Sequence, residues 1–391
     1  MVARRRESAA RRREHTYSYD RLRHEMKATL FAPLMLSLFA TPVGCTNRDS
    51  EGTRRTVDPG HDGGGGGSSP EGGTPRAPVD ATYKFTKFFQ ERASGEDVAK
   101  RVNDFVAALN TDGAAGYRYI DGAETGGGIV TFGEDVLLVK DSASTYTYQA
   151  LPLRFDVVSP STIDVHAELL QQMKTQGAAG FVFVKILAAG LEQGDGRASE
   201  FATLYRKDNG SNATYDYTSA PFPKTSTEYE SLGNAQGANG FRYWASPLMA
   251  NQGQKLYFIK DASSDAKYAV RALVDPRSEI GGDDDAVKAQ FRDQGAQGYR
   301  VQLGFSFEED RGRFSVLYVK DTTQAAVFEY ESLSPPGTIF VTQELADQAN
   351  AQARNGLRYL REPGSPIYFS ARQCTGPLCL TPTESELTFR N

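Results

Sequence analysis

The chain has 391 residues, of which 39% are hydrophobic and 24% are charged, so it holds enough apolar material for globular cores. These proportions exclude a collagen, a coiled coil and a protein with many membrane spans. The formal charge is −5, and it becomes −10 when residues 1–45, with nine Lys/Arg and four Asp/Glu, are left out. A nucleic-acid partner is not expected, because phosphate binding needs a basic face.

Residues 26–45 have the composition of an export signal, and we assign residues 1–45 to a signal sequence. Lys27 precedes an apolar stretch that runs to Phe39, and small residues then lead to Cys45. This order is typical of a signal sequence rather than of a membrane span. Arginine clusters before Met26 lengthen the basic part beyond what export needs, so we expect translation to begin at Met26. A twin-arginine signal is the weaker alternative.

Gly44, directly before Cys45, resembles the end of the lipobox of bacterial lipoproteins, although Pro42 stands where that motif prefers leucine. In those proteins the cysteine receives diacylglycerol and becomes the mature N-terminus. The resemblance implies a lipid-modified Cys45 and a membrane partner reached through that lipid. We expect a lipid-anchored protein of the bacterial cell envelope, in the outer membrane and facing the periplasm or the exterior. Ordinary cleavage and a retained anchor are the alternatives.

Residues 46–80 are expected to form a disordered linker. They include the run Gly63–Gly67 and almost no large apolar side chains. Such a stretch cannot bury enough surface to offset chain entropy. As a flexible coil of about 35 residues it would reach about 30–35 Å, so it reads as a tether between the lipid and a folded body.

The folded body, residues 81–391, is one unit repeated five times. The string TDGAAGYRY, which ends at Tyr119, returns four more times in similar form. Its second glycines are Gly116, Gly180, Gly240, Gly298 and Gly356. A string that ends in Lys-Asp and a set of alternating aromatic or apolar residues follow the first four copies in the same order. We place the repeats at 81–143, 144–212, 213–265, 266–324 and 325–391.

Each unit reads as strand, helix, strand and strand. Apolar residues four apart, such as Phe105 and Leu109, mark one buried helix face. The second glycine is expected to be the helix C-cap, because a Cβ in the left-handed conformation costs about 1–2 kcal/mol. The Lys-Asp strand and the aromatic strand that follows it predict a hairpin. The predicted fold class is α+β, with five tandem β-α-β-β repeats, each a helix packed on a three-stranded antiparallel sheet.

Leu109 and Asn110, with Gly113, Gly116 and Tyr117, resemble the end of the helix in a small bacterial domain family of unknown function. That helix ends in Leu-Asn-x-x-Gly-x-x-Gly-Trp, and Tyr, Phe or Leu replaces the tryptophan here. The similarity covers about 300 residues as successive copies. It implies a fold and no activity.

Five such units fit two arrangements, an open array and a closed five-fold α/β ring, and we expect the open array. The fifth copy lacks the Lys-Asp ending and is followed by residues 386–390, which we interpret as a capping strand.

The sequence offers few groups for catalysis or metal binding. His166 is the sole histidine of the folded body, and we expect it on a helix surface. Ser-His-Asp, Cys-His and multi-histidine metal sites therefore lack ligands or a base, so we predict no catalytic residue, no metal and no cofactor. Cys374 and Cys379 are expected to form a small disulfide loop in an exported protein, with two free thiols as the alternative.

A row of cations recurs with the repeats. Arg118, Arg242, Arg300 and Arg358 follow the glycine-aromatic pair in four units, and Lys140, Lys207, Lys260 and Lys320 end the later strand. If the units stack, the arginines would form an anion-binding row for a polysaccharide or a lipid headgroup. The alternative is that these cations lie on the wet face of each sheet and protect its edges.

The sequence thus favours a membrane-anchored repeat protein that acts as a binding or structural module and is not an enzyme. Envelope glycans and other envelope proteins are the expected partners. One alternative is a hydrolase of cell-wall or extracellular polysaccharide that uses two carboxylates. Another is regulation of an envelope process by a ring-shaped body.

Overall fold

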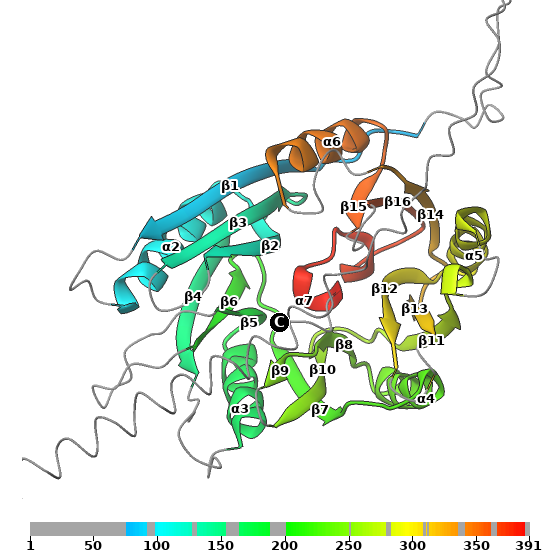
Figure 1. Cartoon of the computed structure of the whole chain (residues 1–391), viewed down its shortest axis with the longest axis horizontal. Helices are drawn as coiled ribbons and strands as arrows, with labels where there is room; N and C mark the ends of the chain where they lie inside the picture. The colour runs from blue at the N-terminus through cyan, green and yellow to red at the C-terminus, as the bar shows by residue number, and fades with distance from the viewer. Residues whose placement is uncertain are drawn as a thin grey trace, which may run out of the picture. The chain divides into compact units, whose positions relative to one another are not determined.

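The computed structural model describes residues 76–387, with gaps at 92–97, 127–130, 154–163, 188–200, 250–251, 279–282, 308–309, 311–312, 335–340 and 361–365 (Figure 1). The described residues fall in one compact unit, Gly73–Asn391. The signal sequence, Cys45 and most of the expected linker lie outside the described residues.

Five units follow one another with the same order of elements. Unit one contains β1 (Thr82–Glu91), α2 (Val98–Ala114), β2 (Arg118–Gly126) and β3 (Thr131–Lys140). Unit two contains β4 (Tyr146–Leu153), α3 (Val165–Ala178), β5 (Phe181–Leu187) and β6 (Phe201–Asp208). Unit three contains β7 (Tyr215–Pro221), α4 (Ser226–Ala238), β8 (Arg242–Ala245), β9 (Leu248–Met249) and β10 (Gly253–Asp261).

The last two units repeat this order. Unit four contains β11 (Tyr268–Val274), α5 (Asp284–Ala296), β12 (Arg300–Ser306) and β13 (Phe314–Asp321), with a 3-10 turn at Pro276–Ser278. Unit five contains β14 (Val327–Ser332), α6 (Gln343–Arg354), β15 (Arg358–Leu360) and β16 (Ile367–Arg372). A 3-10 turn at Pro377–Cys379 and the helix α7 (Glu384–Leu387) end the described chain. The α+β fold of repeated units matches the prediction from the sequence.

Each unit has an antiparallel sheet in which the third strand lies between the first and the second. In unit one, β3 pairs with β1 through the register Tyr83 opposite Val139, and with β2 through Arg118 opposite Val139. The predicted hairpin between the Lys-Asp strand and the aromatic strand is wrong, because β4 pairs with β6 and not with β3. The aromatic strand therefore opens the sheet of the following unit.

Each helix packs against the first strand of the next unit, and this order closes into a ring. The helices α2, α3, α4 and α5 contact β4, β7, β11 and β14 in turn, and α6 contacts β1. Figure 1 shows α6 beside β1. Leu345 and Ala349 of α6 share a core with Tyr83 of β1, so the last contact buries apolar surface as the other four do. The expected open array is wrong, and the ring of separate sheets is the arrangement found.

The first glycine of each pair lets the helix meet the next strand at close range. A Cβ on Gly113, Gly177, Gly237 or Gly295 would clash with the backbone carbonyl oxygen of Tyr146, Tyr215, Tyr268 or Phe328. The second glycines all have positive φ: Gly116 (91°), Gly180 (85°), Gly240 (85°), Gly298 (86°) and Gly356 (81°). An L side chain at these helix ends would be strained, so the two glycines serve different physical needs.

Candidate functional site

A position that recurs at the start of the second strand places arginines inside the ring. Arg118, Arg242, Arg300 and Arg358 begin β2, β8, β12 and β15. Arg118 and Arg300 are only 4% and 1% exposed. They do not form the exposed cationic row expected from the sequence, because the second strands surround α7 rather than facing solvent (Figure 1). We call these four arginines, with Asp141 and Glu386, the interior cluster.

Asp141 is the partner of two of these arginines. Arg118 donates through Nε to Oδ1 of Asp141 at 2.9 Å and through Nη2 to Oδ2 at 2.5 Å. Arg358 Nη1 lies 3.6 Å from the same Oδ2, so Asp141 joins unit one to unit five. Burial alone would raise the pKa of Asp141, but the charge and hydrogen bonds of Arg118 outweigh burial and hold this pKa below its ordinary value.

Glu386 is the partner of the other two. Its Oε2 lies 3.1 Å from Arg300 Nη2 and 3.4 Å from Arg242 Nη1. Burial would raise the pKa of Glu386, but the charges of Arg242 and Arg300 lower it below its ordinary value. Both carboxylates of the interior cluster thus stay ionised, and neither supplies the protonated acid that a two-carboxylate hydrolase needs.

The chain that carries Glu386 enters the interior from unit five. We call residues 373–387 the C-terminal segment. The capping strand expected at residues 386–390 is wrong for its described part, because Glu384–Leu387 forms α7, which contacts β2, β5, β8 and β12. Residues 388–390 lie outside the described residues. Arg118 Nη2 donates to the carbonyl of Thr381 at 2.7 Å, and Arg300 Nη1 lies 3.4 Å from the carbonyls of Leu378 and Leu380. Arginines therefore hold both the carboxylate and the main chain of this segment.

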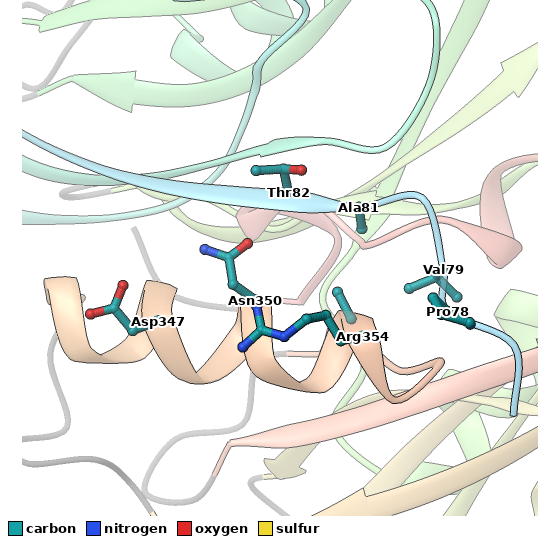
Figure 2. A pocket seen from close by; sticks show the side chains of 8 residues that line it. Pro78, Val79, Ala81, Thr82, Asp347, Asn350 and Arg354 are labelled. Atoms are coloured by element: carbon teal, nitrogen blue, oxygen red, sulfur yellow. The ribbon is translucent and has the colours of Figure 1, made fainter. Parts of the chain in front are cut away.

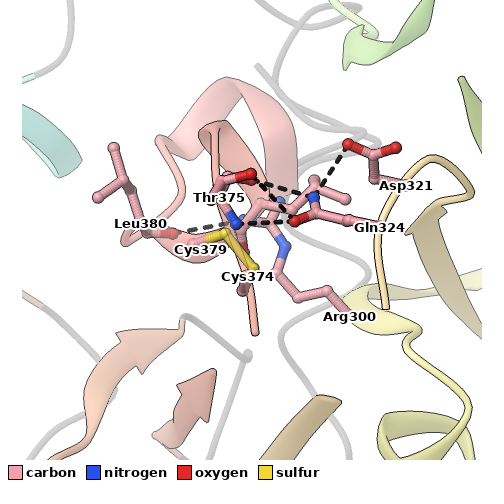
Figure 3. The surroundings of a disulfide bond; sticks show 8 residues. Arg300, Asp321, Gln324, Cys374, Thr375, Cys379 and Leu380 are labelled. Atoms are coloured by element: carbon pink, nitrogen blue, oxygen red, sulfur yellow. Dashed lines mark hydrogen bonds between the residues drawn. A yellow bond between two sulfur atoms is a disulfide. The ribbon is translucent and has the colours of Figure 1, made fainter. Parts of the chain in front are cut away.

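A disulfide and a side-chain amide fix the first half of the C-terminal segment. Cys374 and Cys379 are bonded, with the sulfur atoms 2.07 Å apart. Thr375 N donates to Gln324 Oε1 at 2.7 Å, and Gln324 Nε2 donates to the Thr375 carbonyl at 3.0 Å (Figure 3). The loop is thus attached to the turn that follows β13.

The recurring lysines close the helix ends. Three of them donate from Nζ to a carbonyl in the last turn of the helix of their own unit: Lys140 to Ala115 (3.0 Å), Lys207 to Ala179 (2.9 Å) and Lys320 to Gln297 (2.7 Å). Lys260 lies over the ring of Phe241 at 5.8 Å. A cation at this end also complements the helix dipole, so these lysines have a structural role that does not need an external anion.

The sequence predicted that His166 lies on a helix surface. In the structure it is buried, with 1% of its surface exposed. Its Nδ1 lies 2.8 Å from the hydroxyl of Tyr257, and its Nε2 lies 3.2 Å from the carbonyl of Gly253. Both partners belong to β10 of the next unit, which the sequence does not place beside α3. Burial lowers the pKa of His166, so the neutral ring is favoured in the folded chain.

The contact between α6 and β1, here called the closing joint, carries a groove. Its volume is about 580 Å³, and its lining includes Pro78, Val79, Asp347, Asn350 and Arg354 (Figure 2). Asp347 and Arg354 are exposed and place opposite charges along α6. Asn350 Oδ1 and Nδ2 bond the backbone of Tyr83 at 2.7 and 2.8 Å, so that amide is engaged in closing the ring.

The closing joint differs from the other four because it has Ala353 where they have the first glycine. In the first joint, the carbonyl oxygen of Ser144 lies near Gly116, just after the end of α2. In the closing joint, the carbonyl oxygen of Ala77 takes the same place near Gly356. Ser144 precedes Tyr148, the strand residue bonded by Asn110, by four positions.

At the closing joint, Ala77 precedes the equivalent Tyr83 by six positions. The closing joint therefore has two more residues than the first joint in the stretch that precedes Tyr83 and lies opposite Ala353. In this stretch, Val79 N donates to the Ala353 carbonyl at 3.0 Å. A methyl group cannot fit where the other strands lie, so the chain bulges away at this point. The groove includes the bulge.

The described part of the chain contains neither a membrane-spanning helix nor a cluster of metal ligands. There, no helix has the length and apolar character needed to cross a membrane. Over the same residues, no three His, Cys, Asp or Glu side chains gather in a way that would hold a metal ion.

These features define a repeat protein whose five α+β units close into a ring around its own C-terminal segment. A family model described as PT dipeptide repeat lipoprotein matches residues 160–351. The match supports a repeat-containing lipoprotein and hence association with a membrane through lipid. It begins after β4 of unit two, covers the rest of that unit, units three and four and most of α6, and contains no Pro-Thr pair, so the similarity lies in the folded units. No curated protein and no solved structure matches the chain.

The sequence missed the two acidic members of the interior cluster. Asp141 ends the first Lys-Asp string, which we interpreted only as a strand that leads into a hairpin. Glu386 lies in a mainly polar stretch near the end of the chain, two residues after Glu384. Neither position has a local signal of burial, because each lies next to polar residues and meets its arginine partners only in the folded chain.

Proposed function

We propose that this protein is a non-catalytic binding module of the bacterial cell envelope, anchored by lipid on Cys45 in the outer membrane. The groove at the closing joint is the observation that carries this proposal. It presents both charge signs, through Asp347 and Arg354, next to the apolar side chains of Pro78 and Val79. Because Pro78 is among the last residues of the expected linker (46–80), a ligand bound there would be held close to the tether.

The ion pairs of the interior cluster also support this proposal, because they occupy the recurring arginines. Its arginines are turned inward and paired with Asp141 and Glu386, so external anions do not meet them as an open row. Recognition then falls to outer surfaces such as the groove. Envelope glycans and the surface of another envelope protein both offer the hydroxyls, amides and charges that such a groove would bind.

Ligand binding can be tested with the full chain and two variants. Cosedimentation with purified cell-wall sacculi and with detergent-solubilised outer-membrane proteins would be measured for wild type and for Asp347→Lys/Arg354→Glu. We expect the double variant to lose at least about tenfold in affinity. Lys288→Glu on α5 is the matched control, because its side chain is 56% exposed on the equivalent helix of another joint. Equal retention of the groove variant and the wild type would contradict the proposal.

Lipid attachment has its own test. Cells that express the full chain would be fed an alkyne-bearing fatty acid, and label incorporation would be compared between wild type and Cys45→Ala. We expect label only on the wild type and release of the variant from the membrane fraction. A labelled Cys45→Ala protein would show that the anchor is elsewhere.

A further inference from the structure

The interior cluster divides into two sets with different attachments. Asp141 directly follows β3, which ends at Lys140, so it is part of the ring. It pairs with Arg118 and Arg358. Glu386 comes from the C-terminal segment, and it pairs with Arg242 and Arg300. Within the described residues, the ring supplies Arg242 and Arg300 with no ion-paired carboxylate of its own, and the C-terminal segment brings that charge.

The side chains in this second set are desolvated. Arg300 is 1% exposed and Glu386 is 5% exposed. A buried ion pair is costly to break from one side, because the remaining charge keeps its desolvation penalty without its partner. Burial of Arg242 and Arg300 is therefore favourable only when an acidic side chain pairs with them.

The C-terminal segment is held as a bound peptide is held. Arg118 and Arg300 donate to three of its main-chain carbonyls, at Leu378, Leu380 and Thr381. The hydroxyl of Tyr83 lies 3.0 Å from the hydroxyl of Thr381. Carbonyl contacts of this kind depend on the presence of a peptide chain and not on its covalent link to β16. Glu386 adds a charged anchor five positions after Thr381.

The segment takes no part in the sheets or the helix-to-strand joints of the ring, although Leu378 packs in a core with Val301 and Phe369. The pairings of the five sheets lie between Thr82 and Arg372, and the five helix-to-strand joints use residues before Arg372. Gln373, the next residue, has φ of 51°, and it is the one non-glycine residue of the described chain in the left-handed region. The chain turns sharply there, where it leaves the sheet and enters the interior.

We infer that Arg118, Arg242 and Arg300 form a binding site for an acidic peptide inside the ring, and that residues 373–387 occupy this site in cis. The class of ligand is a short peptide that presents main-chain carbonyls to two arginines and, a few residues later, a carboxylate to a buried arginine pair. This inference is independent of the groove and of the lipid anchor.

The first test weakens the occupant within the full chain. The probe is a fluorescein-labelled synthetic peptide of residues 376–387 with serine in place of Cys379, and its binding is followed by fluorescence anisotropy. Glu386→Gln is expected to bind the probe at least about tenfold more tightly than wild type, because the cis segment has lost its anchor. The same probe with glutamine at position 386 should bind Glu386→Gln at least about tenfold more weakly.

Glu331→Gln is the matched control. It removes a carboxylate that pairs with Arg76 at 2.6 Å on the surface of unit five, with a side chain 41% exposed. We expect this variant to bind the probe no better than wild type. Equal binding by Glu331→Gln and Glu386→Gln, or equal binding of the glutamate and glutamine probes, would overturn the inference.

A second test avoids any loss of folding. A protease site is inserted between Arg372 and Gln373 of the otherwise wild-type chain, which is cleaved after it has folded, and the products are separated by gel filtration under non-reducing conditions. We expect the released piece to stay with the ring in buffer and to be displaced by an excess of the synthetic peptide of residues 376–387, but not by its form with glutamine at position 386. Departure without added peptide, or equal displacement by the two peptides, would overturn the inference.

Discussion

Gly237→Ala tests the idea that glycines set the distance between neighbouring units. A Cβ at this position would clash with the carbonyl oxygen of Tyr268 and would lie 2.7 Å from its carbonyl carbon. Carbon atoms in good contact are about 3.5–4.0 Å apart, so β11 and α4 would have to separate by about 1 Å. Backbone atoms cannot rotate away as a flexible side chain can.

The expected loss of stability is about 2 kcal/mol. Overpacking costs up to about 3 kcal/mol, and alanine recovers up to about 1 kcal/mol of helix propensity over glycine. For a domain of about 300 residues, the midpoint of thermal unfolding should fall by about 3 °C. Circular dichroism melts and urea titrations of the two proteins would measure the change.

The complementary variant is Ala353→Gly at the closing joint, where the strand already bulges away. It removes no clash, so we expect only the helix-propensity cost of about 1 kcal/mol. A Gly237→Ala protein as stable as wild type would refute the reasoning, because it would show that the joints tolerate a methyl group without moving apart.

Three other outcomes are expected. Stability should fall as the pH drops below about 6.5, because burial lowers the folded-state pKa of His166 and the unfolded chain then binds a proton that the folded chain does not. Urea unfolding at pH 7.5 and 5.5 should show a smaller loss for His166→Gln, and an unchanged pH dependence would contradict this assignment. Asp141→Asn should cost about 3 kcal/mol in denaturant titrations, because Arg118 and Arg358 lose a buried counter-charge; a cost below about 1 kcal/mol would mean that water screens the pair. Gly240→Ala should cost about 1–2 kcal/mol, since φ is 85° there, and an unchanged melting midpoint would argue against the strained conformation.

The repeat pattern made the content of each unit predictable. The spacing of Phe105 and Leu109 marks a helix face that is buried in the structure, at 1% and 3% exposure. The left-handed glycines also follow from local chemistry, because one residue and its conformation decide them. Information of this kind lies within about ten residues of sequence.

Contacts between units were not predictable in the same way. His166 lies beside Tyr257, which is 91 residues away, and no local pattern marks that pairing. The open array was expected because the helix faces look alike in every unit, and the alternation of strand residues does not say which neighbour covers them. Ring closure depends on Asn350 reaching Tyr83, a contact across 267 residues.

The arginines show a third limit. Strand alternation indicates that Arg118 and Arg300 lie on the face opposite the helix, and this is usually the solvent face of a small sheet. Here that face is covered by residues from the far end of the chain. A sequence can reveal the polarity of a face, but what covers it is a property of the whole assembly of units.

Head-to-tail closure also bears on how such a chain can change over time. In an open array, gaining or losing one unit leaves every remaining contact intact, so copy number can drift. In this chain the last helix must reach the first strand, and in the other four joints the first glycine sets how closely neighbouring units approach. If a sixth copy were gained, α6 would no longer contact β1, so the need to close the ring keeps the number of units at five.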